Sequence, residues 1–475
     1  MYFCIRYHNG HAIPFVHILN EEGNIIGNTN IDGVLDDVKG VEKVKKKRSN
    51  LDMNKKTHIF LFATIIAMAL PSCKGDDKVK DEKAVDPWTE QMNHNLADLA
   101  TRLDHLPYTT SMSVYNLSAD SFLFNYHERQ QMIPASTLKL LIAISALENL
   151  GIKGEFHTTL HQNGSISGGT LHGDLILVGG FDPLLSLGDL QAMARAVKNA
   201  GIQRVDGRLI GDVSMTDTLR MGNGWSWDDY PSPVTPYLTP LFFDHQRLRT
   251  KNWNMIANPD KHCLRTFASE LQKAGVSVDG ERLLLSTSGV NPRGKELSRI
   301  SHSLSQVLPT MLKESDNLYA EALFYRLASL KKNKGATVQD GLSMVKNTLT
   351  RAGCDNFNFR IVDGSGLSPY DNMTAESQIR LLIYAYNNKM LLFSPLYSSL
   401  AVAGKSGTLA ARMTEGKATS RVHAKTGTSA NACCLTGYAK ASNGDDLAFA
   451  ILSNGVLNPN RCRAFQDDIC QLLCE

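Results

Sequence analysis

The chain lacks a hydrophobic run of the length that crosses a membrane as a helix. Its apolar stretch at 59–70 covers 12 residues, whereas a spanning helix needs about 20. The chain also lacks a strong excess of either charge, because the formal net charge is only +3 over 475 residues. That balance gives no reason to expect nucleic acid or a strongly acidic partner.

Paired cysteine motifs are absent as well. The nine cysteines include no C-x-x-C pair, so neither a zinc motif nor a dithiol redox motif is predicted. Setting aside Cys4 and Cys73, near the N-terminus, leaves seven, an odd number that predicts no complete disulfide framework. Most of the seven are expected to be small buried hydrophobic side chains.

The composition is that of a globular protein, with 43% hydrophobic and 20% charged residues. A chain of 475 residues is expected to hold more than one domain.

A leader-like segment begins at Met53. Two lysines precede the apolar run, and small residues follow it up to Cys73 in the sequence LPSC. This order is typical of a secretory signal, and LPSC resembles a bacterial lipoprotein cleavage box in which Cys73 carries the lipid. We therefore expect a signal at 53–73 and a polar linker at 74–86; a short buried strand or helix is the alternative.

Residues 1–52 lie before that expected signal. They contain short alternating segments broken by turn dipeptides, as in HILNEEGNIIGNTNIDG, which predicts part of a β-hairpin module. The hypothesis is that Met53 is the true start and that 1–52 is a mis-called extension.

The exported part alternates between helical and strand-like patterns. Helical spacing is found at 87–103 and at 136–150, where Gly151 is expected to cap the helix end. Short β-type runs separated by glycine turns fill 156–298, and helical periodicity returns after 304. Two paired strands and a last helix close the chain. We expect an α/β domain, formed by 87–155 and 299–475, interrupted by β-rich inserted domains at 156–298.

A serine and a lysine three residues apart open the chemistry. A serine hydroxyl needs an adjacent base to become a nucleophile, and two residues three apart on a helix lie on one face. Ser136 and Lys139 have this spacing at a helix start, where the positive helix end favours a developing oxyanion. The structural alternative is a core helix with a snorkelling lysine.

Order along the chain separates this pair from chance matches. S-x-x-K also occurs at Ser329 and Ser343, but both follow the S-D-N triplet that begins at Ser315. Only Ser136 can therefore begin the series S-x-x-K, S-D-N, K-T-G.

The third motif occurs twice, as KSGT from Lys405 and as KTGT from Lys425. A strand, a turn, a second strand and a helix are expected after Lys425. Another glycine turn and a charged stretch follow Lys405 instead. Lys425 is therefore the predicted functional lysine.

With these motifs in register, residues from about 90 to 475 resemble the bacterial serine D-Ala-D-Ala carboxypeptidase/endopeptidases, the class C low-molecular-mass penicillin-binding proteins. Further similar stretches are GDLILVGGFDP at 173–183, HSLSQVLPTMLKESDNLYAE at 302–321 and VDGSGLS at 362–368. The resemblance implies a serine β-lactamase/transpeptidase-like domain with an antiparallel five-stranded sheet. The 175 residues at 140–314 and the lack of E-x-x-L-N after Asn317 disfavour a class A β-lactamase.

The resemblance implies a role for each motif residue. Ser136 would be the acylated nucleophile and Lys139 its base, with Lys425 as a second cation that also attracts the terminal carboxylate. Ser315 would relay a proton to the leaving group, and Asn317 would hold the acyl-side amide. Substrate and oxyanion binding would fall to Thr426, Gly427, Thr428 and the N–H groups of Ser136 and Thr428. No metal or organic cofactor is required.

One position departs from the relatives. An arginine that often follows the Gly-Leu-Ser turn is replaced by Pro369, while the aspartate expected to act with it is kept as Asp182. Asp182 could pair with an ammonium group of the substrate by itself, or it could simply form a turn before Pro183.

The leading interpretation is a periplasmic, lipid-anchored peptidase that acts on peptidoglycan peptides and is inhibited by β-lactams. A β-lactamase or esterase on the same scaffold is the second. A non-catalytic wall-binding or antibiotic-sensing protein is the third, which the intact motifs disfavour.

Overall fold

The computed structural model describes residues 2–8, 11–19, 25–30 and 87–475, apart from 227–231, 233, 247–254, 279–281 and 355–358. The chain forms two compact units, Met1–Lys83 and Ala84–Glu475. The first contains a three-stranded antiparallel sheet, as its alternating segments predict, made of β1 (Tyr2–His8), β2 (His11–Leu19) and β3 (Ile25–Asn30). The expected signal and linker, 53–86, lie outside the described residues.

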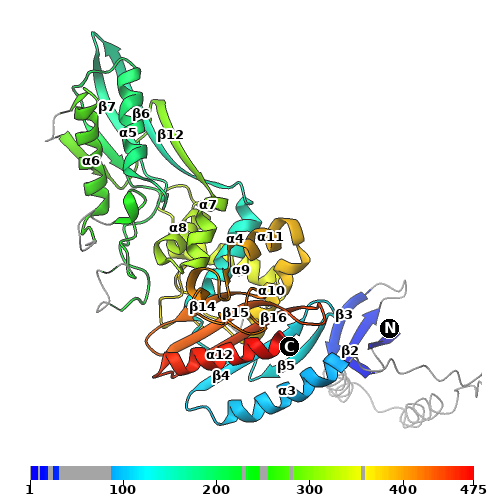
Figure 1. The fold of residues 1–475 in the computed structure, drawn as a ribbon. Coiled ribbons are helices and arrows are strands. Elements are labelled where there is room, and N and C mark those ends of the chain that lie inside the picture. The colour runs from blue at the N-terminus through cyan, green and yellow to red at the C-terminus, as the bar shows by residue number, and fades with distance from the viewer. Residues whose placement is uncertain are drawn as a thin grey trace, which may run out of the picture. The chain divides into compact units, whose positions relative to one another are not determined.

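The second unit is built on an antiparallel sheet with the strand order β13-β14-β15-β16-β4-β5 (Figure 1). Five of these strands have six or more residues, which agrees with the expected five-stranded sheet, and the two-residue β13 extends its edge. The strands are β4 (Thr109–Asn116), β5 (Ser121–Tyr126), β13 (Ala401–Val402), β14 (Val422–Thr428), β15 (Ala432–Lys440) and β16 (Asp446–Asn454).

Helices cover both faces of this sheet, and the alternation of side chains along β15 shows why. Leu435 and Ala439 belong to the core under α3 (Pro87–Asp104) and α12 (Pro459–Leu473), whereas Cys434 and Tyr438 belong to the opposite core. A strand buried on both faces is apolar on both. The opposite core is formed with α4 (Lys139–Leu150), α7 (Leu304–Lys313), α8 (Asn317–Ala328), α9 (Val338–Arg351), α10 (Ala375–Asn387) and α11 (Ser394–Ser399).

A second sheet, of seven strands, is inserted between α4 and α7. It begins with β6 (Glu155–Ser167) and ends with β12 (Lys295–Ser303), which pair so that Glu155 lies opposite Ser303 (Figure 1). Between them lie β7 (Thr170–Val178), β8 (Arg204–Val205), β9 (Leu209–Asp212), β10 (Ser277–Val278) and β11 (Leu283–Ser286). The chain therefore leaves and re-enters the main domain at one place.

This inserted unit is not purely β. Two amphipathic helices, α5 (Leu187–Asn199) and α6 (Pro259–Lys273), share its apolar core. The sequence pattern does not predict them, because the glycine turns around them suggest short strands. A capping box formed by Ser186 and Asp189 marks the start of α5 and is the signal that could have revealed it.

The helix expected at 136–150 has two parts. Residues Ala135–Leu138 form a 3-10 turn, η1, and α4 then runs from Lys139 to Leu150. Gly151 ends α4 as predicted: its φ is +68°, in the left-handed region, and its N–H donates to the carbonyl of Leu147.

Candidate active site

The serine and lysine of the first motif are in direct contact. Lys139 Nζ lies 2.7 Å from Ser136 Oγ. Lys139 is fully buried at the first position of α4, while Ser136 stays partly accessible in the 3-10 turn before it. Ala135 holds this turn with a φ of +46°, an uncommon conformation for a residue with a side chain. A partly exposed hydroxyl bonded to a buried amine is the pair that nucleophilic catalysis requires.

The same lysine connects the first motif to two other segments. Its Nζ donates to Asn317 Oδ1 at 2.7 Å and to the carbonyl of Ser365 at 2.6 Å. Asn317 begins α8, and its amide also donates to the carbonyl of Val234 at 2.8 Å. The structure thus brings together the predicted Ser136, Lys139 and Asn317, with Ser365 as a partner that sequence reasoning missed.

The third motif lies on β14. Lys425 is fully buried, and its Nζ donates to Ser315 Oγ and to the carbonyl of Thr426, both at 2.7 Å. Ser315 has a φ of +62°, and such backbone strain concentrates at functional sites. The two serine–lysine pairs, Ser136 with Lys139 and Ser315 with Lys425, are therefore linked through the S-D-N segment, because Lys139 binds Asn317 and Lys425 binds Ser315.

Burial lowers the pKa of both lysines. The pKa of Lys139 falls from 10.5 to about 8, mainly because burial penalises the charged amine, although Asp363, Asp316, Glu321 and Asp371 oppose the shift. The pKa of Lys425 falls well below its ordinary value through burial and then through the positive charge of Lys139. A lysine near pKa 8 can accept a serine proton near neutral pH.

An acidic cluster near Lys139, formed by Asp363, Glu321 and Asp371, holds the turn that includes Ser365. The carboxylate of Asp363 accepts the backbone N–H groups of Ser365, Gly366, Leu367 and Ser368 and the indole N–H of Trp225. Burial and the Asp363 charge raise the pKa of Glu321 to about 8. The pKa of Asp371 is also raised well above its ordinary value by burial. The VDGSGLS stretch contains Asp363, so its resemblance was a signal for this role.

A further missed contact supports the S-D-N segment. His245 Nε2 lies 2.7 Å from Asp316 Oδ2, and Asp316 also caps α8 by accepting the N–H of Tyr319. Burial opposes ionisation of Asp316, yet the bond from His245 holds the pKa of that carboxyl below its ordinary value.

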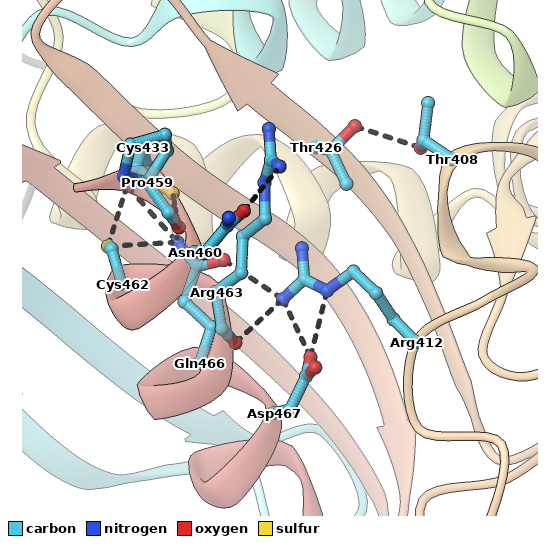
Figure 2. Close-up of polar contacts among 10 residues, drawn as sticks. All are labelled: Thr408, Arg412, Thr426, Cys433, Pro459, Asn460, Cys462, Arg463, Gln466 and Asp467. Atoms are coloured by element: carbon cyan, nitrogen blue, oxygen red, sulfur yellow. Dashed lines mark hydrogen bonds and ion pairs between the residues drawn. The ribbon is translucent and has the colours of Figure 1, made fainter.

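The expected substrate-binding residues follow Lys425 on β14. A side chain at Gly427 would meet the carbonyl oxygen of Pro134 at 2.8 Å, so only glycine lets β14 approach the turn that contains Ser136. Thr426 Oγ1 bonds to Thr408 Oγ1 at 2.8 Å (Figure 2). Thr428 is exposed at the strand end.

Asp182 and Lys405 occupy different surroundings. The Asp182 side chain has no exposed surface: it contacts His302 Nδ1 at 2.7 Å and accepts the N–H of Leu184 at 3.0 Å. This geometry favours the turn-forming alternative, because the carboxylate already has its partners. Lys405 is exposed in a turn that follows β13.

Among the residues that the structure describes, no group of three or more histidine, cysteine, aspartate or glutamate side chains could hold a metal ion. Nor is any helix among them long and apolar enough for a membrane span. All seven cysteines between 263 and 474 are free and buried, as predicted for small hydrophobic residues.

A half-buried serine bonded to a buried lysine, beside a second serine–lysine pair at a strand edge, defines a serine acyl-transfer enzyme. The pattern of the D-Ala-D-Ala carboxypeptidase 3 (S13) family matches residues 92–252 and 243–475. The chain belongs to this family of serine-type carboxypeptidases.

Two curated relatives match this chain over most of their own length. It is 25% identical over 430 residues to the D-alanyl-D-alanine carboxypeptidase DacB of Haemophilus influenzae, covering 76% of this chain and 88% of that protein. It is 28% identical over 432 residues to a D-alanyl-D-alanine carboxypeptidase of an Actinomadura species, covering 74% and 79%.

The fold also matches a solved structure. Penicillin binding protein 4 of Haemophilus influenzae superposes with a TM-score of 0.72 at 23% identity, over 79% of this chain and 98% of that one. The predicted fold class and family are therefore confirmed.

Proposed function

We propose that this protein hydrolyses peptidoglycan stem peptides and cross-links at D-alanyl-D-alanine-type bonds, through an acyl-enzyme on Ser136. The observation that carries the proposal is the position of the fully buried Lys139, whose Nζ lies 2.7 Å from both Ser136 Oγ and Asn317 Oδ1. That amine has a pKa of about 8 and can take the serine proton as the hydroxyl attacks.

The remaining residues divide the other steps between them. Backbone N–H groups of Ser136 and Thr428 would stabilise the oxyanion, for which one donor typically contributes about 3–4 kcal/mol. Ser315, which accepts a hydrogen bond from Lys425, would pass a proton to the departing amine. Asn317 would hold the acyl-side amide. Water then attacks the ester and frees Ser136.

β-Lactams fit the same chemistry. Attack by Ser136 on the lactam carbonyl would open the ring, and the resulting ester would remain until water removed it. A peptidase releases this adduct slowly, whereas a β-lactamase on the same scaffold releases it quickly.

A reporter penicillin tests the proposal. We expect one labelled residue, Ser136, no label in Ser136→Ala, and slow loss of the label. The folded protein giving no adduct on Ser136 would overturn the assignment, and rapid release of the adduct would favour the β-lactamase alternative.

The sequence further supports action outside the cytoplasmic membrane, with a lipid on Cys73. The basic flank, the apolar stretch at 59–70 and the LPSC sequence are its basis. Mass spectrometry of the mature protein should find Cys73 as the lipidated first residue. A mature peptide containing residues before Met53 would contradict both the cleavage and the start at Met53.

A further inference from the structure

An arginine from the last helix reaches the strand of the third motif. Arg463 lies in the second turn of α12 and is half-buried. One of its terminal nitrogens donates to Thr428 Oγ1 at 3.4 Å, and the other donates to Asn460 Oδ1 at 3.4 Å. Figure 2 shows its side chain extending from α12 toward the strand that includes Thr426. A guanidinium thus contacts Thr428 at the end of β14, two residues after Thr426 on the same strand.

This guanidinium is not held by a carboxylate within the part of the chain that the structure describes. The neighbouring Arg412 shows the contrast, because it binds Asp467 Oδ1 through two nitrogens at 2.9 and 2.7 Å (Figure 2). Arg463 instead makes two long bonds to neutral oxygens. Exchange of these long bonds for shorter, charge-assisted bonds to an anion would be favourable.

The surroundings of Lys425 explain why a second cation would be needed to bind a carboxylate. Its amine is fully buried, and both of its bonds are directed to Ser315 and to the Thr426 carbonyl. Its pKa is also lowered by burial and by Lys139, so it attracts an external carboxylate less than an ordinary lysine does. An arginine keeps its charge at any pH of interest, and its fork matches a carboxylate.

We propose that Arg463, with the hydroxyls of Thr426 and Thr428, binds the free carboxylate of the residue on the leaving-group side of the scissile bond. The proposal rests on the proposed function and deepens it. It makes α12, which follows all three motifs in the sequence, part of the recognition of peptides that end in a free acid. The ring carboxylate of a penicillin would occupy the same place.

The test compares a penicillin with its methyl ester, which lacks that charge. The measured quantity is the rate constant for acylation of Ser136 by each compound. In Arg463→Ala the rate with the acid should fall by about 10- to 100-fold, as expected for loss of a hydrogen bond to a charged group. The rate with the ester should change by less than about twofold, because the ester has no charge for Arg463 to bind. A structural defect would instead slow acylation by both compounds.

Two further variants serve as a conservative replacement and as a matched control. Arg463→Lys should recover part of the acid rate, since it keeps the charge without the fork. Arg461→Ala is the matched control: this exposed arginine lies two residues away on the same helix and should leave the ratio of acid to ester rates unchanged. Thermal unfolding of each variant verifies the fold.

The outcomes separate the two proposals. If the wild type is not acylated by either compound, the proposed function is wrong and the role of Arg463 is rejected with it. If the wild type is acylated normally but Arg463→Ala keeps the wild-type ratio of acid to ester rates, only the role of Arg463 is wrong.

Discussion

Two tetrads of nearly identical sequence, KSGT from Lys405 and KTGT from Lys425, have different structures. The second lies on β14 and pairs residue for residue with β15, so that Lys425 faces Thr436 across the sheet. The first follows the two-residue β13, and its Gly407–Leu409 segment forms a 3-10 turn. Lys425 is buried and Lys405 is exposed. Strand register, which the four letters do not encode, decides which lysine reaches Ser315.

The tetrads are nevertheless neighbours. β13 pairs with β14, and the last residue of the first tetrad, Thr408, bonds to the second residue of the other, Thr426. The glycines are both necessary but for different reasons. Gly427 admits the Pro134 carbonyl, whereas Gly407 has a φ of +59° and lies where a side chain would meet the Lys313 carbonyl at 2.5 Å.

The largest expected difference between the tetrads is in turnover. Lys425→Ala removes the amine bonded to Ser315, and we expect kcat/KM for a D-Ala-D-Ala peptide to fall by about a thousandfold, within the range of acid–base catalysis. Lys405→Ala should change it by less than about twofold, because this side chain is exposed. Steady-state kinetics on both folded variants provide the measurement. Equal losses in the two variants would remove the distinction.

The glycines should fail in different ways. Gly427→Ala forces β14 away from the nucleophile turn, and we expect kcat/KM to fall by about 10- to 100-fold, since small misplacements are costly in catalysis. Gly407→Ala should mainly lower the free energy of unfolding, by about 1–3 kcal/mol, because of its positive φ and the crowded site. Denaturant unfolding and kinetics on the folded protein separate the effects; a stable, inactive Gly407→Ala would contradict this.

The pH profile of acylation should depend on the buried Lys139 and the nearby Asp316, and not on Lys405. Lys139 must be neutral to act as base, so acylation should rise about tenfold per pH unit and level off above about pH 8. Asp316 raises the pKa of Lys139. Asp316→Asn should therefore move the midpoint to lower pH. The control, Lys405→Ala, should keep the wild-type midpoint. A midpoint that stays in place or moves to higher pH in Asp316→Asn would contradict the claim that Asp316 raises the pKa of Lys139.

The smallest effect is expected where the tetrads touch. Thr408→Val removes the hydroxyl that bonds to Thr426 and should raise KM about threefold, the size of one neutral hydrogen bond. The value of kcat should change little, because Thr408 lies beside the binding strand and not at Ser136. An unchanged KM would mean that the two tetrads are neighbours without functional coupling.

Periodicity and the resemblance to the family predicted the fold class, and motif order selected the residues that the structure brings together at Ser136. Local periodicity could not reveal contacts between distant segments. The Ser365 carbonyl at Lys139, the His245–Asp316 pair and the His302 partner of Asp182 join residues 71 to 226 positions apart. Asp182 illustrates the point, because its expected role needed a free carboxylate, and only the structure reveals His302 beside it.

The paired ends of the inserted sheet bear on how the active site assembles during folding. Lys139 and Asn317 are 178 positions apart, yet their side chains meet. Once β6 and β12 pair at Glu155 and Ser303, the chain that still connects Lys139 to Asn317 outside the paired strands shortens to roughly 30 residues. The entropy cost of closing that loop then falls by about 1.5 kcal/mol. The inserted unit thus lowers the conformational price of joining the first two motifs, and its strand pairing is expected to precede formation of the catalytic centre.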